Sequence, residues 1–545
     1  MAHTYATDVL VVGAGPVGLT AAVELRRRGV SCRIVDRLPE RLPFAKAVGI
    51  QPRTLELWDR MGLVRTALEA AVPLRGQLVY VNGVEQLRFE MAMPPEVPYG
   101  FAALPQYETE RVLAEFLARF GTGIERGVEL VSFTQDADGV TSRVRTPSGA
   151  EEEVRTRFLV GCDGAHSAVR KGLGLTFEGG ALPDEFMLAD VALDWDLPHD
   201  HTVRAMHQDA SGTVDDVLVC IPLPGAGRYR VSMTVPPELS ATSQTGQAPD
   251  GVAHGLQTAG RAPELSDIQA VLDRLSPQPT TASAIRWTSV FRISHRIVDR
   301  YGDGRVFVAG DAAHIHPPTG AQGMNTGIQD AWNLAWKLAL AVDGRAHPDL
   351  LAGYDAERRP IGEEVVGRTL RHAAHGVQAD PEDPATLMLR EAQLLVGYRG
   401  SPITDPPGEG QGPRPGDRAP DCVGLSGEIA AYPLRLYDLL RDRDHVLLLY
   451  GAAQDPGALA RTAREASGGR VETFVVLTAG APHDASDGLP VYTDTAGQFA
   501  RLYETDGPTA FVIRPDGYLG ARLTPPTPEA LRTHLARTFA PTGQG

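Results

Sequence analysis

The chain has 545 residues, of which 43% are hydrophobic and 22% charged, a composition typical of a globular protein with roughly two to four domains. Its formal net charge of −16 argues against a nucleic-acid-binding surface, and no stretch is long and apolar enough to predict a membrane span. The first apolar run lacks the basic segment of a signal peptide, and no cysteines form the C-x-x-C pair of a zinc ribbon or a dithiol redox centre. We therefore expect a cytoplasmic protein with no nucleic-acid partner and no membrane association. The cysteines are Cys32, Cys162, Cys220 and Cys422.

The first folded stretch has the order strand, glycine-rich turn, helix, strand. An apolar run, Val9 to Val12, predicts a buried parallel strand, and residues 19–28 predict a helix with apolar side chains on one side. Gly29 ends this helix, and a second strand, Cys32 to Val35, ends in Asp36. These elements predict the first part of a dinucleotide-binding fold.

The turn of this stretch carries the pattern G-x-G-x-x-G. Its first glycine makes the tight turn, its second lets the backbone approach a pyrophosphate, and its third lets helix and strand pack closely. The helix N-terminus presents N–H groups to the phosphates, and an acidic residue about 20 residues further on can accept a ribose hydroxyl. We therefore predict binding of an ADP moiety, in preference to a glycine-rich turn in another α/β unit. The candidate contacts are Gly13, Gly15, Pro16, Val17, Gly18 and Asp36.

The next elements alternate between helices and strands. A helix is predicted to begin near Pro52, and residues 74–99 have a strand pattern with a hairpin signal at Asn82-Gly83. An amphipathic helix is predicted over Glu108 to Phe120. A meander of three strands follows, at residues 129–133, 140–146 and 154–160.

A change of composition near Phe177 predicts a second, sheet-based domain over residues 177–289. This second domain is inserted into the first domain, which comprises residues 1–176 and 290–400. Residues 74–99 are expected to join the sheet of the inserted domain. A Ser/Thr/Gly/Pro/Gln-rich loop, 236–261, interrupts the inserted strands. The predicted strands are 186–193, 217–222 and 229–235 in the insertion and 305–309 after it; helices are predicted over 328–342 and 348–373.

A Pro- and Gly-rich stretch, 401–420, is interpreted as a linker. It precedes a compact α/β module over residues 421–545. The strands predicted in this module are 445–450, 472–477, 510–514 and 518–523.

Three stretches in this order resemble the class A flavoprotein monooxygenases, the aromatic hydroxylases of the para-hydroxybenzoate hydroxylase type, over about residues 5–395. They are the N-terminal fold, Asp163-Gly164 with Arg170, and Gly310-Asp311 before a glycine-rich turn into a helix. The last module resembles the thioredoxin-like extension of the phenol and aromatic polyketide hydroxylase branch, with Gly507-Pro508-Thr509 similar to its cis-proline corner. The resemblance implies an α/β fold: a Rossmann-like FAD-binding domain with an inserted β-sheet substrate domain and a C-terminal thioredoxin-like domain. Because the redox dithiol is missing, we expect a structural role for that last domain.

The resemblance also implies cofactor contacts outside the glycine-rich turn. The glycines are expected to hold the FAD pyrophosphate and Asp36 the adenosine ribose, while Arg37 lies on the adenine side. Lys46 stands where the family usually has an arginine near the ribityl chain, which keeps the charge without the bidentate geometry. Gln106 and Arg111 match positions that touch the cofactor from a helix.

The second and third motifs are expected to serve the flavin end. The resemblance implies that Asp163 serves both FAD and the nicotinamide cofactor and that Asp311 accepts a ribityl hydroxyl. The glycine-rich turn would bring backbone N–H groups to the isoalloxazine ring, and the positive end of the following helix would stabilise the reduced anion. The residues of this turn are Pro318, Gly323, Met324 and Asn325.

The implied reaction is hydroxylation of a phenolic or polycyclic aromatic, polyketide-like substrate by molecular oxygen through a flavin hydroperoxide. FAD is reduced by NADPH or NADH. Baeyer–Villiger insertion, hydroxylation of a monocyclic phenol, and a flavoprotein that only sequesters an aromatic compound remain alternatives. Tyr229 and Trp287 are the candidate substrate contacts on the inserted sheet. No catalytic base can be named, a monomer or homodimer is expected, and His314 with His316 lack a nearby third ligand for a metal.

Overall fold

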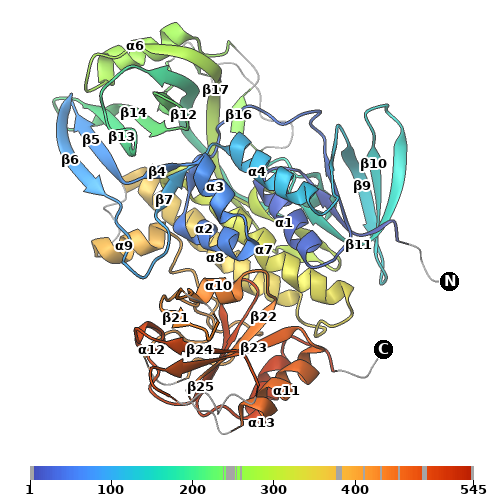
Figure 1. Ribbon diagram of the computed structural model, residues 1–545. Helices are drawn as coiled ribbons and strands as arrows, with labels where there is room; N and C mark the ends of the chain where they lie inside the picture. The colour runs from blue at the N-terminus through green and yellow to red at the C-terminus, as the bar shows by residue number, and fades with distance from the viewer. Residues whose placement is uncertain are drawn as a thin grey trace.

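The computed structural model describes residues 5–236, 239–240, 252, 255–257, 261–375, 383–408, 411–429, 432–451, 455–481 and 488–541. Most of the predicted loop 236–261 lies outside the described residues. Three sheets dominate the molecule: one in the N-terminal domain, one in the insertion and one in the C-terminal domain (Figure 1). Among the described residues, no helix is long and apolar enough to cross a membrane.

The N-terminal domain is built on a mainly parallel sheet with the order β18-β19-β11-β1-β2-β8. β1 lies between β2 and β11 because its apolar residues can be buried on both faces. β9 and β10 continue from β11 as the antiparallel meander that the sequence predicts. The bounds are β1 Thr7–Val12, β2 Cys32–Asp36, β8 Ile124–Arg126, β9 Glu129–Gln135, β10 Val140–Arg145, β11 Glu151–Gly161, β18 Gly302–Asp303 and β19 Val306–Val308.

Helices cover this sheet, and α1 packs against both α4 and α7. α2 begins at Pro52, as predicted, while α7 begins at Gln322, earlier than the sequence indicates. A small sheet of order β3-β7-β4 shares an apolar cluster with the insertion, in which Leu74 and Ala103 join Trp287. The bounds are α1 Pro16–Arg27, α2 Pro52–Met61, α3 Val64–Ala70, α4 Gln106–Ala118, α5 Ala168–Gly172, α7 Gln322–Val342, α8 Ala352–His375, α9 Pro384–Glu391, β3 Gly49–Ile50, β4 Val72–Leu74 and β7 Phe101–Ala103.

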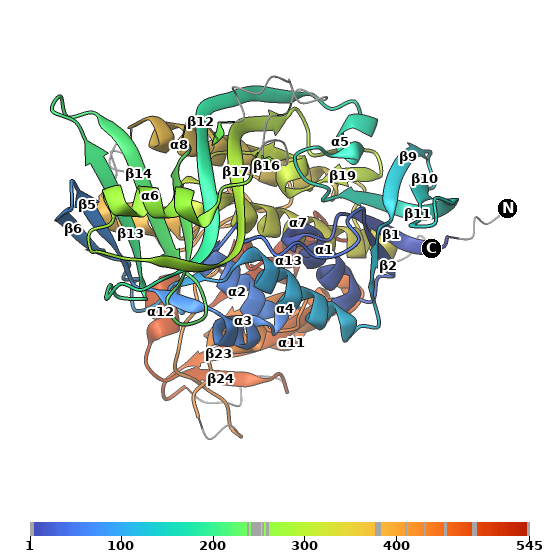
Figure 2. The ribbon, with the colours of Figure 1, turned by 90° about the horizontal axis from the view of Figure 1, so that it is seen from above.

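The inserted sheet has the order β16-β17-β12-β15-β14-β13-β5-β6. The predicted hairpin at Asn82-Gly83 is confirmed, and its strands, β5 and β6, pair into this sheet through β13. β12 and β17 run side by side (Figure 2), and β17 continues across the predicted boundary at 289–290. The sequence did not predict β13 or α6. The bounds are β5 Gly76–Val81, β6 Val84–Glu90, β12 Phe177–Leu193, β13 His201–Gln208, β14 Val214–Pro222, β15 Arg228–Thr234, β16 Gly255–Gln257, β17 Ala282–Val298 and α6 Leu265–Leu275.

The C-terminal domain has a sheet of order β21-β24-β23-β22-β25-β26, in which β22, β23 and β24 are parallel and β25 and β26 antiparallel. All four predicted strands are present, and β24 was not predicted. The bounds are β21 Leu425–Ser426, β22 His445–Tyr450, β23 Val471–Thr478, β24 Val491–Asp494, β25 Thr509–Ile513, β26 Leu519–Leu523, α10 Leu436–Leu440, α11 Pro456–Ser467, α12 Gln498–Tyr503 and α13 Pro528–Leu535.

Two expectations about this part of the chain need correction. The cis peptide bond among the described residues is Thr524–Pro525, so Gly507–Pro508 is trans. A proline motif alone does not decide the isomer, because X–Pro bonds differ by only about 0.5–1 kcal/mol and tertiary packing selects one. The stretch predicted as a linker is packed where it is described: Arg418 forms an ion pair with the buried Glu56 at 2.6 Å.

Candidate functional site

A cavity of about 290 Å³ opens at the carboxyl ends of β1, β2 and β11. Its lining joins the glycine-rich turn after β1, the end of β2, the segment before β3, one side of α4 and the turn after β11. Ligands of open parallel sheets bind at this edge. A larger open hollow of about 680 Å³ near Asp136, Asp303 and His347 contains none of the predicted site residues.

The smaller cavity brings together predicted residues that are far apart in the sequence. Pro16, Val17 and Gly18 form the first turn of α1 next to it. Asp311 is connected to it through Lys46, whose Nζ lies 3.1 Å from Asp311 Oδ2. The predicted residues in the lining are Gly13, Gly15, Asp36, Arg37, Lys46, Gln106 and Asp163.

The three glycines of the turn have different surroundings. A Cβ on Gly13 would lie 2.3 Å from the carbonyl oxygen of Cys162, and one on Gly18 would lie 1.9 Å from that of Gly13. A Cβ on Gly15 would meet no heavy atom within 4 Å. Gly15 is also the N-cap of α1 and contributes no side-chain cap. The helix N-terminus therefore faces an open cradle that fits a pyrophosphate.

Asp36 fixes the edge of this cradle. Its Oδ2 accepts a hydrogen bond from the N–H of Ala14 at 2.8 Å, and its Oδ1 accepts one from Leu38 at 2.8 Å. Arg126 lies 3.4 Å from the same carboxylate and also lines the cavity. The predicted ribose-binding residue thus has a second role, which is to hold the end of β2 against the turn.

Asp163 caps α5 through its side chain. It accepts hydrogen bonds from Ser167 Oγ at 2.5 Å, from the N–H of Ala168 at 2.7 Å and from that of Val169 at 3.2 Å. Burial raises the pKa of this carboxyl group, and the hydrogen bonds oppose the shift. The predicted contact of Asp163 with a nicotinamide cofactor stays a prediction.

The turn into α7 is joined to the start of α2 by Asn325. Its Oδ1 accepts hydrogen bonds from the N–H of Gln51 at 3.0 Å and from Thr54 Oγ1 at 2.7 Å, while its Nδ2 donates to the carbonyl oxygens of Gly49 at 2.9 Å and Ala321 at 2.8 Å. All four hydrogen-bonding positions of the amide are therefore used within the protein. Any contact of Asn325 with a ring comes from its main chain.

His316 lies beside the other residues of this turn. A Cβ on Gly323 would be 3.2 Å from His316 Nε2, and no described residue forms a hydrogen bond with that nitrogen. Burial lowers the pKa of His316 to about 4, so the ring is neutral. Pro318 is exposed and Met324 half-buried in the same turn. Among the described residues, no group of three or more possible ligands surrounds a metal position.

Two predicted residues lie away from the sites proposed for them. Arg111 does not line the cavity, because it points along the surface of α4, where its Nε lies 2.7 Å from Glu108 and its Nη1 lies 2.8 Å from Glu115. Tyr229 is buried on the α6 side of the inserted sheet, with its ring centroid 5.2 Å from that of Trp195. Successive residues of a strand alternate between faces, and the sequence alone did not assign the face.

Trp287 lies on the opposite face of that sheet, toward the N-terminal domain. Its ring centroid is 5.4 Å from that of Phe44, which lines the cavity. The indole Nε1 is buried and has no hydrogen-bond partner within the part of the chain that the structure describes. Of the two predicted substrate contacts, only Trp287 therefore lies on the sheet face that packs toward the N-terminal domain.

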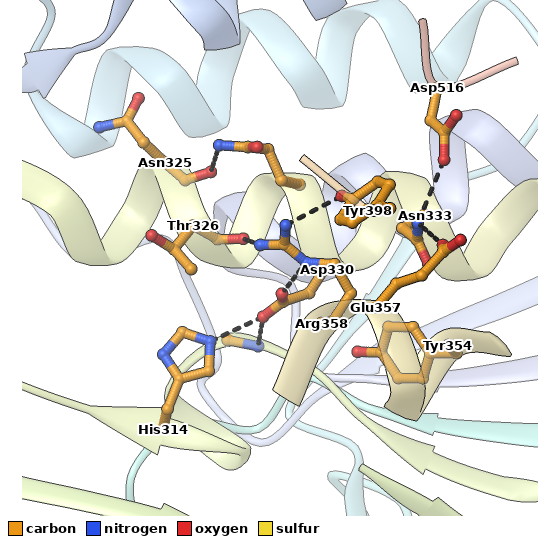
Figure 3. A network of polar contacts seen from close by, with 12 residues as sticks. His314, Asn325, Thr326, Asp330, Asn333, Tyr354, Glu357, Arg358, Tyr398 and Asp516 are labelled. Atoms are coloured by element: carbon orange, nitrogen blue, oxygen red, sulfur yellow. Dashed lines mark hydrogen bonds and ion pairs between the residues drawn. The ribbon is translucent and has the colours of Figure 1, made fainter. Parts of the chain in front are cut away.

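Sequence reasoning missed Asp330, whose carboxylate lies at the centre of the buried contacts in Figure 3. Its Oδ2 accepts hydrogen bonds from the N–H of Gly310 at 3.1 Å and from His314 Nε2 at 2.7 Å, and its Oδ1 accepts one from Arg358 Nε at 2.7 Å. The signal in the sequence was the one acidic residue of the predicted helix 328–342, most of whose side chains are apolar. Such a charge is buried only when it is paired.

Sequence reasoning also missed Glu110 in the lining of the cavity. Gln106 Nε2 donates to its Oε1 at 2.9 Å. Burial raises the pKa of Glu110 to about 7, while Gln106, Arg126 and Arg41 oppose the rise. Glu110 lies one turn after Gln106 on α4, and this spacing was the available signal. The amphipathic pattern of the helix could not distinguish Glu110 from an ordinary surface carboxylate.

The nucleotide-binding sheet with its inserted domain and its open glycine turn at the carboxyl edge defines a dinucleotide-binding protein. Residues 6–369 match the model of the FAD binding domain family. The chain is 36% identical over 545 residues to 6-methylpretetramide 4-monooxygenase of Streptomyces rimosus, covering 94% of this chain and 90% of that protein. It is 31% identical over 540 residues to pentachlorophenol 4-monooxygenase of Sphingobium chlorophenolicum, covering 94% and 93%.

Among solved structures, the complex of aklavinone-11 hydroxylase with FAD and aklavinone is similar, with a TM-score of 0.78 and 25% identity over 98% of this chain and 99% of that one. The chain therefore belongs to the FAD binding domain family. The predicted fold class is confirmed, as are the predicted cofactor FAD and the predicted class of FAD-dependent aromatic monooxygenase.

We expect Gly15→Ala to leave the fold intact and to weaken FAD binding, because its Cβ fills the cradle without touching protein atoms. The dissociation constant should rise at least about tenfold, since a hydrogen bond to a charged group is worth on the order of 1.5–3 kcal/mol. Equilibrium dialysis with FAD measures this. Gly18→Ala is the contrasting variant: its Cβ meets a carbonyl oxygen, so it should lower the melting temperature. Equal melting temperatures for the two variants would contradict this assignment.

We expect the affinity for FAD to fall as the pH rises through about 7, the pKa of Glu110. An anionic pyrophosphate in the same cavity favours the neutral carboxyl group, so the protonated protein binds FAD more tightly and ionisation weakens binding. The dissociation constant at pH 8.5 should exceed that at pH 6.0 by about fivefold. Glu110→Gln should remove this dependence. If the pH dependence of the dissociation constant persists in the glutamine variant, it arises from another titratable group.

Proposed function

We propose that this protein hydroxylates a polycyclic phenol of the polyketide type, with FAD in the cavity, NADPH or NADH as reductant and molecular oxygen as second substrate. Bound FAD supplies the oxygen-transfer chemistry. The protein has to bind the cofactor, hold the aromatic ring beside it and exclude water. The similarity to the 6-methylpretetramide and aklavinone hydroxylases over nearly the whole chain supports this assignment.

The described residues fit FAD in one orientation. The open N-terminus of α1 at Gly15 suits the pyrophosphate, and Asp36 at the end of β2 suits the adenosine ribose. Lys46 and Asp311, which pair at 3.1 Å, would hold the ribityl chain. The isoalloxazine ring would then lie at the turn before α7, where the helix N-terminus favours negative charge.

The substrate side of this space is the face of the inserted sheet that carries Trp287. Strand register places Trp287 of β17 opposite Asp190 of β12, Asp190 opposite Arg230 of β15, and Arg230 opposite Ile221 of β14. These residues share one face because paired residues of neighbouring strands point the same way. Trp287 and Ile221 belong to the apolar cluster that contacts Phe44.

Arg230 is the observation that most directly supports an acidic substrate. Its guanidinium has no hydrogen bond or ion pair among the described residues, and its Nε is buried without a partner. The carboxylate of Asp190, directly across the strand pair, is bound to Arg228 instead. Burial lowers the pKa of Arg230 to about 10, so it remains charged near neutrality.

Arg230 is half-buried, and a partly desolvated cation without a counter-ion is unfavourable unless a ligand supplies one. A phenolate or enolate oxygen is such a ligand, and ionisation also makes the aromatic ring electron-rich, as attack by an electrophilic oxygen requires. Arg230 would thus bind the acidic oxygen and lower the pKa of the bound phenol. No protein side chain is then needed as a base at that atom.

The proposed function predicts that one class of phenol strongly accelerates NADPH oxidation by the purified protein in air and gains one oxygen atom. The measurement combines NADPH absorbance with product mass for polycyclic hydroxyanthraquinones and for monocyclic chlorophenols. Turnover of chlorophenols alone would support the monocyclic alternative, and a ring-expanded ester would indicate Baeyer–Villiger insertion. Tight binding of a phenol without formation of a product would support the alternative of a flavoprotein that only sequesters an aromatic compound.

We expect Arg230→Gln to raise the KM for the phenol found above by about tenfold or more, because the variant loses the free energy of a hydrogen bond to a charged group. Arg230→Lys should recover part of the loss because it keeps the charge. The methyl ether of the same phenol serves as a control, since its oxygen cannot ionise. Binding of this ether should be unchanged in the glutamine variant. Equal losses for phenol and ether would mean that Arg230 only shapes the pocket.

A further inference from the structure

The turn 514–518 of the C-terminal domain, between β25 and β26, is buried in the N-terminal domain. Arg514, Asp516 and Tyr518 are each 2% exposed. The C-terminal domain lies beneath α2, α7 and α8 (Figure 1), and this turn contacts all three helices. None of its residues lines the cofactor cavity.

On one side the turn holds α7 and α8. Arg514 is paired with Glu357 of α8 through two contacts of 2.6 and 2.8 Å. Asp516 Oδ2 accepts hydrogen bonds from Asn333 Nδ2 at 3.1 Å and from Trp336 Nε1 at 3.2 Å, both of α7. The turn therefore restrains α7 about halfway along the helix that begins at the proposed flavin contact.

On its other side the turn holds α2. Arg53 Nη2 donates to the carbonyl oxygen of Asp516 at 2.7 Å, and Arg60 Nε donates to that of Pro515 at 3.1 Å. The Arg53 guanidinium also lies 4.7 Å from the ring centroid of Tyr518. α2 and α7 meet again at the flavin end, where Asn325 is bound to Gln51 and Thr54.

A third connection runs through the ring of Tyr518. Its centroid lies 4.2 Å from that of Tyr398, whose hydroxyl accepts a hydrogen bond from Arg358 Nη1 at 3.0 Å. Arg358 also donates to the carbonyl oxygen of Thr326 at 3.1 Å and to Asp330 at 2.7 Å. Figure 3 shows this guanidinium between Tyr398, Thr326 and Asp330. Asp330 in turn holds the N–H of Gly310, next to Asp311.

We propose that Tyr518 is a positioning residue, through which the C-terminal domain sets the geometry of the flavin-facing turn without contacting the cofactor. The inference rests on the proposed placement of the flavin at the start of α7. The ring of Tyr518 restrains Arg53 on α2 and Tyr398 beside Arg358, so both segments that meet at Asn325 are braced from one point. This gives the C-terminal domain, which lacks a redox dithiol, a role in the reaction cycle.

The matched pair Tyr518→Leu and Tyr518→Phe tests this proposal. The Tyr518 hydroxyl has no hydrogen-bond partner among the described residues, so phenylalanine keeps every contact of the ring while leucine removes it. In the leucine variant we expect FAD binding to weaken about three- to tenfold, the range of mutational effects on coupling between distant sites. The visible absorbance of bound flavin should shift, and more NADPH should be consumed per product formed. The phenylalanine variant should match the wild type.

Arg470→Gln controls for general loosening of the domain contact. Arg470 forms ion pairs with Asp343 of the N-terminal domain and with Asp444 at the same interface, away from the turn. A leucine variant with a lower melting temperature but wild-type FAD affinity, flavin spectrum and coupling would overturn the proposal. Arg53→Lys should show the same changes if Tyr518→Leu does not fold. A wild-type protein that binds no FAD would instead overturn the proposed function.

Discussion

The carboxylate of Asp330 is the charge on which much of the structure depends. It is fully buried within α7, and burial alone would raise its pKa, but Arg358 and His314 reverse the shift and keep the pKa below its usual value. Removing one partner from such a group leaves an uncompensated charge in the interior. The requirement for neutralisation therefore fixes α8, the strand after η3 (Gly310–Ala312) and the N–H of Gly310 around one point of α7.

The same principle explains how the C-terminal domain is attached. Glu357, Lys337 and Arg514 are buried together at the interface, and each needs the others because none reaches solvent. Burial lowers the pKa of Lys337 to about 8, while the pairing holds that of Glu357 below its usual range. A contact built on mutually neutralised charges is specific in geometry, since each donor must meet its acceptor. A domain held in this way can transmit restraint to the helices it touches.

The inserted sheet divides its two faces between packing and substrate. One face buries Tyr229 against Trp195 and α6, and the other carries Trp287, Asp190 and Arg230 toward the N-terminal domain. The apolar side chains of the first face are buried within the inserted domain itself. The second keeps a guanidinium and an indole N–H without partners among the described residues, which is the pattern expected of a face that is completed by a ligand.

The sequence by itself determined the nucleotide-binding unit, because its pattern is local: the turn from Gly13 to Gly18 joins adjacent elements, Gly13 and Gly18 leave no room for a side chain, and Gly15 leaves the cradle open. It also determined the predicted strands of the C-terminal sheet, because their short apolar runs indicate buried strands. Only the tertiary structure decided the face of Tyr229, the partners of Arg111 and the isomer of Gly507–Pro508. It alone revealed Glu110, Arg230 and Asp330 as site or network residues. The physical reason is that burial, strand register and the choice among several possible ion-pair partners are fixed by how the elements pack, and a local sequence pattern does not contain that packing.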